Sequence, residues 1–162
     1  MKQSQAGFTL LESMLAGAIL TIGLLALSAM QAISMNRNVG SNEMTKVSNL
    51  AADMIERVQF NRRNVTAYHN ISVNSSTTTC PTATVNVMAN GDCVQWRALL
   101  LNSGLTNVSG SVTLSPAPPA VDPQGLTRST VTVQLSWLAT QKGESMVTMN
   151  KSMTLVTVIA PE

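Results

Sequence analysis

The chain has 162 residues, of which 11% are charged, 44% are hydrophobic and 3% are aromatic, and its formal net charge is +2. This length fits one modest domain, or one membrane segment followed by a small domain. The weak net charge argues against a polyanionic partner, and the scarcity of aromatic residues argues against a base-stacking surface. The hydrophobic residues are concentrated in the first forty positions, and the remainder is rich in Ser, Thr, Asn and Val.

The N-terminal segment combines a short polar leader with a long apolar run. Residues 1–6 carry one positive charge, at Lys2, and residues 13–36 contain neither a charge nor a proline. This run exceeds the about 20 residues that a helix needs to span a bilayer, and a helix satisfies its own backbone in lipid. Lys2 and the terminal amine favour a cytoplasmic N-terminus. We therefore expect a single-pass membrane helix, with the rest of the chain outside the cytoplasm.

A cleavable secretory signal is an alternative interpretation of this run, with Ala29–Ala32 as a loose small-x-small cleavage site. The length of the run and the carboxylate of Glu12 near its start argue against it. A carboxylate deep in lipid costs about 2.5–3.5 kcal/mol, which favours a functional role, whereas a carboxylate at headgroup level costs little and can be passive. Taken alone, Glu12 leaves both roles open.

The hexapeptide Gly7-Phe8-Thr9-Leu10-Leu11-Glu12, placed between a basic leader and an apolar helix, resembles the class III signal of type IV prepilins. The resemblance implies cleavage by a prepilin peptidase between Gly7 and Phe8 and methylation of the new Phe8 amine. It also implies that Glu12 is the glutamate that stands fifth in the mature chain of this family. Glycine lacks a side chain and suits the close backbone approach of a peptidase. In a low-dielectric filament core, Glu12 of one subunit would attract the Phe8 amine of a neighbour, although part of the gain offsets desolvation.

After Asn36 the sequence becomes amphipathic and stays helical. Apolar residues recur at three- and four-residue spacing between Val47 and Val58, with charged residues between them. We expect one helix from Phe8 to about Asn61. Its first half is apolar on all sides, and its second half has one apolar stripe that faces a domain.

The polar residues that follow predict short elements. Residues 62–79 are interpreted as the helix end and a loop, and residues 83–88 as a short strand. Asn90-Gly91-Asp92 is interpreted as a turn whose Asp92 caps a short helix. That helix is expected to end before Gly104. Its expected inner face consists of Cys93, Trp96, Leu99 and Leu100.

A β-hairpin is expected near the C-terminus. Gly110–Leu114 is a weak strand, and the proline-rich residues Ser115–Gly125 are interpreted as a loop. Arg128–Leu138 and Met146–Ile159 are the best strands, with a turn at residues 141–144 between them. An antiparallel sheet packed on the long helix gives an α+β fold, in which the first half of the helix spans the membrane.

Cys80 and Cys93 are the only cysteines, with residues 81–92 between them. A pair this close in an exported segment indicates a disulfide, whereas two free thiols are the alternative in a reducing cytosol. The membrane argument favours the disulfide, which would contribute about 3 kcal/mol to stability.

Among the type IV prepilins, the chain is most similar to the PilV-type minor pilins, also called type IV pilus modification proteins. It is carried by residues 17–27 and 51–62, with weaker similarity at the short helix around Trp96 and at Val131–Trp137. It implies the pilin fold, a long N-terminal helix on a small antiparallel sheet domain. The implied divisions are a prepilin leader at 1–7, a transmembrane and filament-core helix at 8–36, an amphipathic continuation at 37–63 and a periplasmic α+β domain at 64–162.

This resemblance implies a structural subunit that primes or modifies pilus assembly, in a tip complex. The subunit would reside in the inner membrane with its C-terminal domain in the periplasm, and then in a pilus on the cell surface. The implied partners are the prepilin peptidase, other major and minor pilins through the N-terminal helix, inner-membrane lipid before assembly, and a tip adhesin. The alternatives are a minor pseudopilin of a type II secretion system, whose N-terminus is similar, and a minor pilin for DNA uptake.

Catalytic chemistry is not expected. His69 is the only histidine and is interpreted as a solvated loop residue, so neither a metal cluster nor a hydrolase triad is expected around it. The glycines form no phosphate-binding loop, and no cofactor is expected. Arg57, Arg62 and Arg63 form a small basic cluster, interpreted as a solvated helix end because basic residues suit a helix C-terminus. Nucleic acid is therefore not an expected partner.

Overall fold

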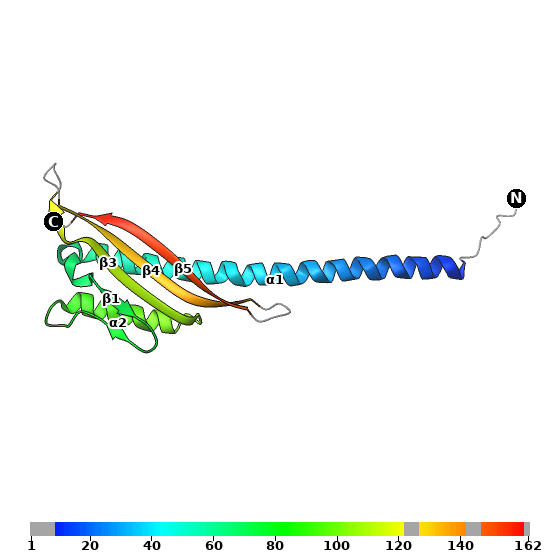
Figure 1. Ribbon diagram of the computed structural model, residues 1–162, viewed down its shortest axis with the longest axis horizontal. Helices are drawn as coiled ribbons and strands as arrows, with labels where there is room; N and C mark the ends of the chain where they lie inside the picture. Colours follow the sequence, from blue (N-terminus) through cyan, green and yellow to red (C-terminus); the bar gives the residue numbers. More distant parts are fainter. Residues whose placement is uncertain (1–8, 122–126, 142–146, 161–162) are drawn as a thin grey trace. The chain divides into compact units, whose positions relative to one another are not determined.

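The computed structural model describes residues 9–121, 127–141 and 147–160, and the chain forms two compact units that divide between Val39 and Gly40. Helix α1 (Leu10–Phe60) begins in the first unit and ends in the second (Figure 1). The prediction of one unbroken helix that ends near Asn61 is confirmed, while its expected first residue, Phe8, lies outside the described residues. The four-part division of the chain implied by the resemblance stays a prediction.

The second unit contains the C-terminal part of α1, two further helices and a five-stranded antiparallel sheet of order β2-β1-β3-β4-β5 (Figure 1). The helices are the 3-10 helix η1 (Arg62–Tyr68) and α2 (Val87–Leu101). The strands are β1 (Ile71–Val73), β2 (Thr78–Thr79), β3 (Thr106–Val121), β4 (Thr127–Gln141) and β5 (Val147–Ile159). The expected α+β fold with a C-terminal antiparallel hairpin is therefore confirmed.

One core joins the sheet to the helices of the second unit. Alternate residues of β4 are buried, as the two-residue period of a strand requires when one face meets a core: Val131, Val133, Leu135, Trp137 and Ala139. The second half of α1 buries residues at helical spacing: Val47, Ala51, Met54, Ile55 and Val58. Each fully buried side chain of this size contributes about 1.5–3 kcal/mol, so this stripe fixes α1 against the sheet.

The start of α2 differs from the expected strand and turn. Residues 87 and 88 are helical, and the expected strand at 83–88 is wrong. The side chain of Asn86 accepts a hydrogen bond from the Ala89 backbone N–H at 2.8 Å, so Asn86 is the N-cap. Asn90-Gly91-Asp92 therefore lies within the helix, and Asp92 is not its cap. Cys93, Trp96 and Leu100 are buried as expected, but Leu99 is 44% exposed.

The proline-rich segment after Leu114 is also not the expected loop, because β3 continues through it to Val121. The bonds before Pro116 and Pro118 are cis, and the register with β4 shifts between Ser115 and Ala120. The Ser129 hydroxyl of β4 donates to the Pro116 carbonyl at 2.8 Å. β1 pairs only with residues 110–112 of β3, so the prolines fall where β3 has no partner on that side, which a strand tolerates.

Residues 62–79, expected to be a loop, contain η1, β1 and β2. Val65 and Tyr68 of η1 are buried, and Ile71 and Val73 of β1 are buried on either side of an exposed Ser72. These apolar residues attach the segment to the core. Residues 142–144 of the expected hairpin turn lie outside the described residues.

Candidate functional site

The first turn of α1 places Glu12 in a capped helix start. Thr9 precedes the helix, and the Glu12 backbone N–H lies 3.4 Å from the Thr9 hydroxyl oxygen, which in turn lies 3.4 Å from Glu12 Oε2. This T-x-x-E arrangement resembles a capping box, and a carboxylate in the first turn suits the helix dipole. Glu12 is exposed, and among the described residues its hydrogen bonds are with Thr9 of the same turn. The sequence interpretation missed this local role of Glu12. Gly7 and Phe8 lie outside the described residues.

The part of α1 that follows Glu12 exposes an apolar surface on every side. Every described side chain from Leu10 to Met35 is exposed, and among the described residues α1 contains the one stretch that could cross a membrane by its length and composition. Two hydroxyls in the middle of this surface form hydrogen bonds within the helix. Thr21 Oγ1 donates to the Gly17 carbonyl at 2.7 Å, and Ser28 Oγ donates to the Leu24 carbonyl at 2.9 Å. The surface therefore presents few unmet hydrogen-bonding groups to an apolar environment.

Cys80 and Cys93 form the predicted disulfide. Cys93 is fully buried in α2, and Cys80 is partly buried against the same core. The bond therefore ties the segment before α2 to the middle of that helix.

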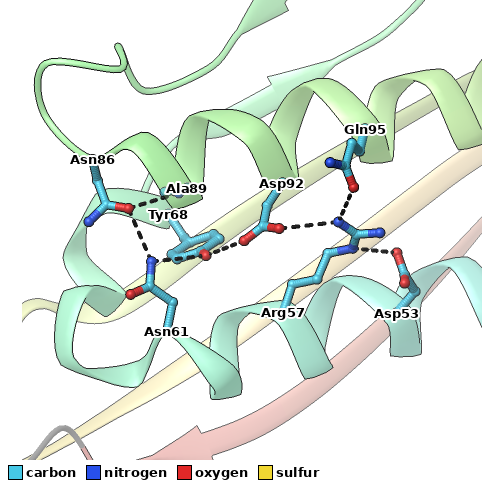
Figure 2. Close-up of polar contacts among 8 residues, drawn as sticks. All are labelled: Asp53, Arg57, Asn61, Tyr68, Asn86, Ala89, Asp92 and Gln95. Carbon is cyan, nitrogen blue, oxygen red and sulfur yellow. Dashed lines mark hydrogen bonds and ion pairs between the residues drawn. The ribbon is translucent and has the colours of Figure 1, made fainter.

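A chain of polar contacts joins α1, η1 and α2, and we call it the Asp92 network (Figure 2). Arg57 of α1 donates to Asp53 Oδ2 at 2.9 Å, to Asp92 Oδ1 at 3.1 Å and to Gln95 Oε1 at 3.0 Å. The Tyr68 hydroxyl of η1 donates to the other oxygen of Asp92, Oδ2, at 2.5 Å. Both oxygens of Asp92 therefore accept hydrogen bonds, which compensates for the partial burial of its carboxylate.

Asn61 extends the Asp92 network to the start of α2. Its side-chain amide lies 3.2 Å from the Tyr68 hydroxyl oxygen and 3.1 Å from Asn86 Oδ1, the atom that caps α2. Asn61 is itself buried. The end of α1 and the beginning of α2 are thus held by the same amide.

Burial raises the pKa of the Tyr68 hydroxyl well above its ordinary value, and its hydrogen bond to Asp92 raises it further. For Arg57, burial would lower the pKa, but the hydrogen bonds and charges of Asp53 and Asp92 outweigh it and raise the pKa. Tyr68 is therefore neutral and Arg57 is charged at neutral pH.

The structure changes the sequence-based interpretation of two basic residues, His69 and Arg57. His69 lies in the turn after η1, as expected, but it is half-buried, and its Nδ1 accepts a hydrogen bond from the Leu114 backbone N–H of β3 at 3.1 Å. Arg57 does not belong to a solvated basic cluster, because its guanidinium is held by Asp53 and Asp92. The one sequence signal for this network is Asp92, a lone acid among apolar residues of α2.

A second polar cluster joins α1 to the C-terminal hairpin. Glu43 Oε2 accepts a hydrogen bond from Trp137 Nε1 of β4 at 3.2 Å and lies 3.7 Å from Lys151 Nζ of β5. Lys151 therefore points from the strand towards α1. This contact identifies the face of β5 that is directed towards α1.

Comparison of the chain with family models, with curated proteins and with solved structures finds no significant match. The structure itself combines a long N-terminal helix, apolar in its first half, with a second half that packs on an antiparallel sheet. This combination is consistent with a pilin-like fold.

Proposed function

We propose that this protein is a minor pilin of the PilV type, a structural subunit that primes or modifies assembly of a type IV pilus. The observation that carries the proposal is the start of α1, where a capped turn containing Glu12 leads directly into a helix surface that is apolar and exposed on every side. Directly before it stands the Gly7-Phe8 pair of a prepilin-type signal.

The apolar part of α1 supports this proposal through its dimensions. Residues 10–35 span about 39 Å at about 1.5 Å per residue, longer than the about 30 Å of a hydrocarbon core. Such a surface requires lipid around it, or the apolar helices of other subunits. A filament core made of such helices buries the same apolar surface as lipid does, so the helix can move from the membrane into the filament.

The exposed carboxylate of Glu12 supports a pairing role. Within the described chain it is contacted only by its own helical turn. In the proposed filament it pairs with the Phe8 amine that the prepilin peptidase releases on a neighbouring subunit. An ion pair of this kind acts more strongly in low dielectric and sets the axial register of the subunits.

The second half of α1 and the domain around it support a pilin that presents a folded domain outside the membrane. Residues 51–62, which carry part of the PilV-type resemblance, provide the buried stripe of α1 and Arg57 of the Asp92 network. The disulfide suits an oxidising compartment such as the periplasm.

Paired variants at Glu12 test the proposal. Glu12→Ala removes both the charge and the capping side chain, whereas Glu12→Gln removes the charge and keeps a side chain suited to a capping box. We expect both variants to reach the membrane with the disulfide intact and to be depleted from sheared surface filaments. The measurement is the ratio of subunit in filaments to subunit in the inner membrane. Normal incorporation of Glu12→Gln would show that Glu12 acts only as a cap, and the pairing mechanism would be wrong.

The same fractionation of the wild-type chain tests the pilus assignment. We expect the chain in sheared surface filaments. A chain that is absent from them, and whose deletion stops protein secretion while piliation stays normal, would contradict the pilus proposal in favour of a pseudopilin.

A further inference from the structure

Helix α2 is apolar on two opposite sides. Its inner side packs in the core through Ala89, Cys93, Trp96 and Leu100. Its outer side carries a second set of apolar or small residues, which we call the α2 stripe: Val87, Gly91, Val94, Ala98 and Leu101. Val87 is 75% exposed, Val94 55% and Leu101 40%. A helix normally exposes a polar side opposite its buried side, so an exposed apolar stripe in that position indicates a contact surface.

The spacing of the α2 stripe specifies the kind of partner. Its members recur at intervals of four, three, four and three residues, the pattern of a coiled-coil seam. Gly91 and Ala98 are small and allow close approach of another helix. In Figure 2, Asp92 and Gln95 point towards Arg57 on α1, so the stripe, on the side of α2 opposite to the core, is free to receive a helix.

The two flanks of the α2 stripe carry opposite charge. The flank on the side of α1 contains three carboxylates and one guanidinium: Asp53, Glu56, Asp92 and Arg57. The net charge of this flank is therefore −2. On the other side lies Arg97 of α2, whose Nε is 3.4 Å from the Asn74 carbonyl oxygen. A surface with an apolar centre, one acidic flank and one basic flank is complementary to a copy of itself.

We propose that the α2 stripe binds the α2 stripe of a second copy of this chain, with the two α2 helices parallel. In a parallel pair, the opposite flanks of the two helices face each other, so Arg97 of each copy faces the acidic flank of the other. Arg97 and Glu56 also lie at similar heights along the paired helices. Gln95, two residues before Arg97, contacts Arg57, and Glu56 is adjacent to Arg57 in α1. An antiparallel pair would instead oppose like charges.

The size of the surface indicates where this pairing occurs. A helix of the length of α2 is about 22 Å long, and one helix–helix contact buries less than the about 800 Å² per partner of a stable interface. A groove of about 400 Å³ beside the stripe, lined by Phe60 and Met88 among others, adds some apolar area. A contact this small is sufficient when α1 holds both copies in one membrane, because the effective concentration is then high. The pairing goes beyond the proposed pilus function and requires only this shared membrane.

Photocrosslinking of the full chain in its membrane tests the pairing. A photoreactive amino acid at Val94 is expected to give an adduct with twice the mass of the chain. The matched control is the same amino acid at Thr154, an exposed position of β5, which is expected to give about tenfold less of this adduct. An adduct only with a different protein, or no adduct at Val94, would overturn the proposal.

A charge exchange distinguishes a second copy from any other helix. Arg97→Glu and Glu56→Arg alone are each expected to reduce the Val94 adduct about tenfold, since each opposes like charges across the pair. The double variant is expected to restore it, because both copies then carry the exchanged charges. Unchanged thermal unfolding of the single variants excludes misfolding as the cause. A double variant that stays as weakly crosslinked as the single variants would overturn the parallel self-pairing.

Discussion

At the scale of single residues, Gly110 is the described glycine at which packing leaves least room. This glycine of β3 is buried under α2, and a methyl group on it would lie 2.8 Å from Cζ3 of Trp96 and 3.0 Å from Cδ1 of Leu100. The constraint comes from contact with a large side chain, because the backbone of Gly110 does not have a positive φ angle.

We predict that Gly110→Ala lowers the free energy of unfolding by about 1–3 kcal/mol, the usual cost of overpacking a core. Gly91→Ala in α2 is the matched control, because a methyl group there meets nothing within 4 Å and should stabilise the helix by up to about 1 kcal/mol. Urea unfolding of the full chain in mild detergent, followed by tryptophan fluorescence, measures both. Equal stability of Gly110→Ala and the wild type would contradict the packing.

Tyr68 makes the stability depend on pH in the alkaline range. Because its pKa is raised in the folded state, the neutral hydroxyl stabilises the fold. This contribution is complete below about pH 10, the pKa of tyrosine in an unfolded chain, and is lost as the pH rises towards the folded pKa.

We predict that Tyr68→Phe lowers the free energy of unfolding by about 1.5–3 kcal/mol at pH 7, because Asp92 loses the hydrogen bond to one oxygen. The difference between variant and wild type should shrink above about pH 10. Urea unfolding at a series of pH values checks both parts. A difference that is the same at pH 7 and pH 11 would show that the hydroxyl does not carry the effect.

At the scale of elements, the disulfide connects the irregular segment before α2 to the buried side of that helix. We predict that the double variant Cys80→Ala and Cys93→Ala loses about 3 kcal/mol of stability, the value for a short closed loop. A reducing agent should lower the stability of the wild type by a similar amount and leave the double variant unchanged. Sensitivity of the double variant to the reductant would mean that the effect has another origin.

The elements with long and regular periodicity could be predicted from the sequence. The apolar run is long enough to span a bilayer as a helix, and the stripe from Val47 to Val58 has a helical period. No proline interrupts either of them, so α1 could be predicted from the local sequence. Arg128–Leu138 lies within β4, and its polar and apolar residues alternate from Thr130 to Trp137. The stripe of α1 and the alternation of β4 are strong patterns because each of these segments meets the core with one face.

The elements that were missed depend on contacts between distant residues. Val85 and Val87 alternate like a strand, but the cap at Asn86 starts α2 between them. The prolines after Leu114 resemble a loop, yet pairing with β4 keeps the segment extended. Among the candidate site residues, the disulfide could be predicted from spacing and compartment. The Asp92 network could not, because it joins three elements that are separate in the sequence.

At the scale of the whole molecule, the chain divides into a unit whose described helix surface is apolar and exposed and a unit with a complete core. In the proposed function the first unit is inserted in the membrane, and a leader is removed from it without disturbing the folded second unit.

We predict cleavage between Gly7 and Phe8. The intact mass of the membrane-extracted chain should correspond to loss of residues 1–7 and gain of one methyl group, because the prepilin-type signal implies both steps. Loss of the prepilin peptidase should leave the full-length mass, with the disulfide formed. A mature chain that begins near Ile33 would instead indicate an ordinary secretory signal.

The position of β5 at the end of the strand order has a consequence for aggregation. Among the described strands, β5 has one hydrogen-bonded neighbour, so its other edge offers backbone groups to any extended chain nearby. Lys151 points inward to Glu43, and a charge on the core-facing side of an edge strand makes continued pairing unfavourable, since an added strand would have to bury it. If α1 holds several copies in one membrane, as proposed above, we expect this lysine to disfavour a common sheet between their β5 edges.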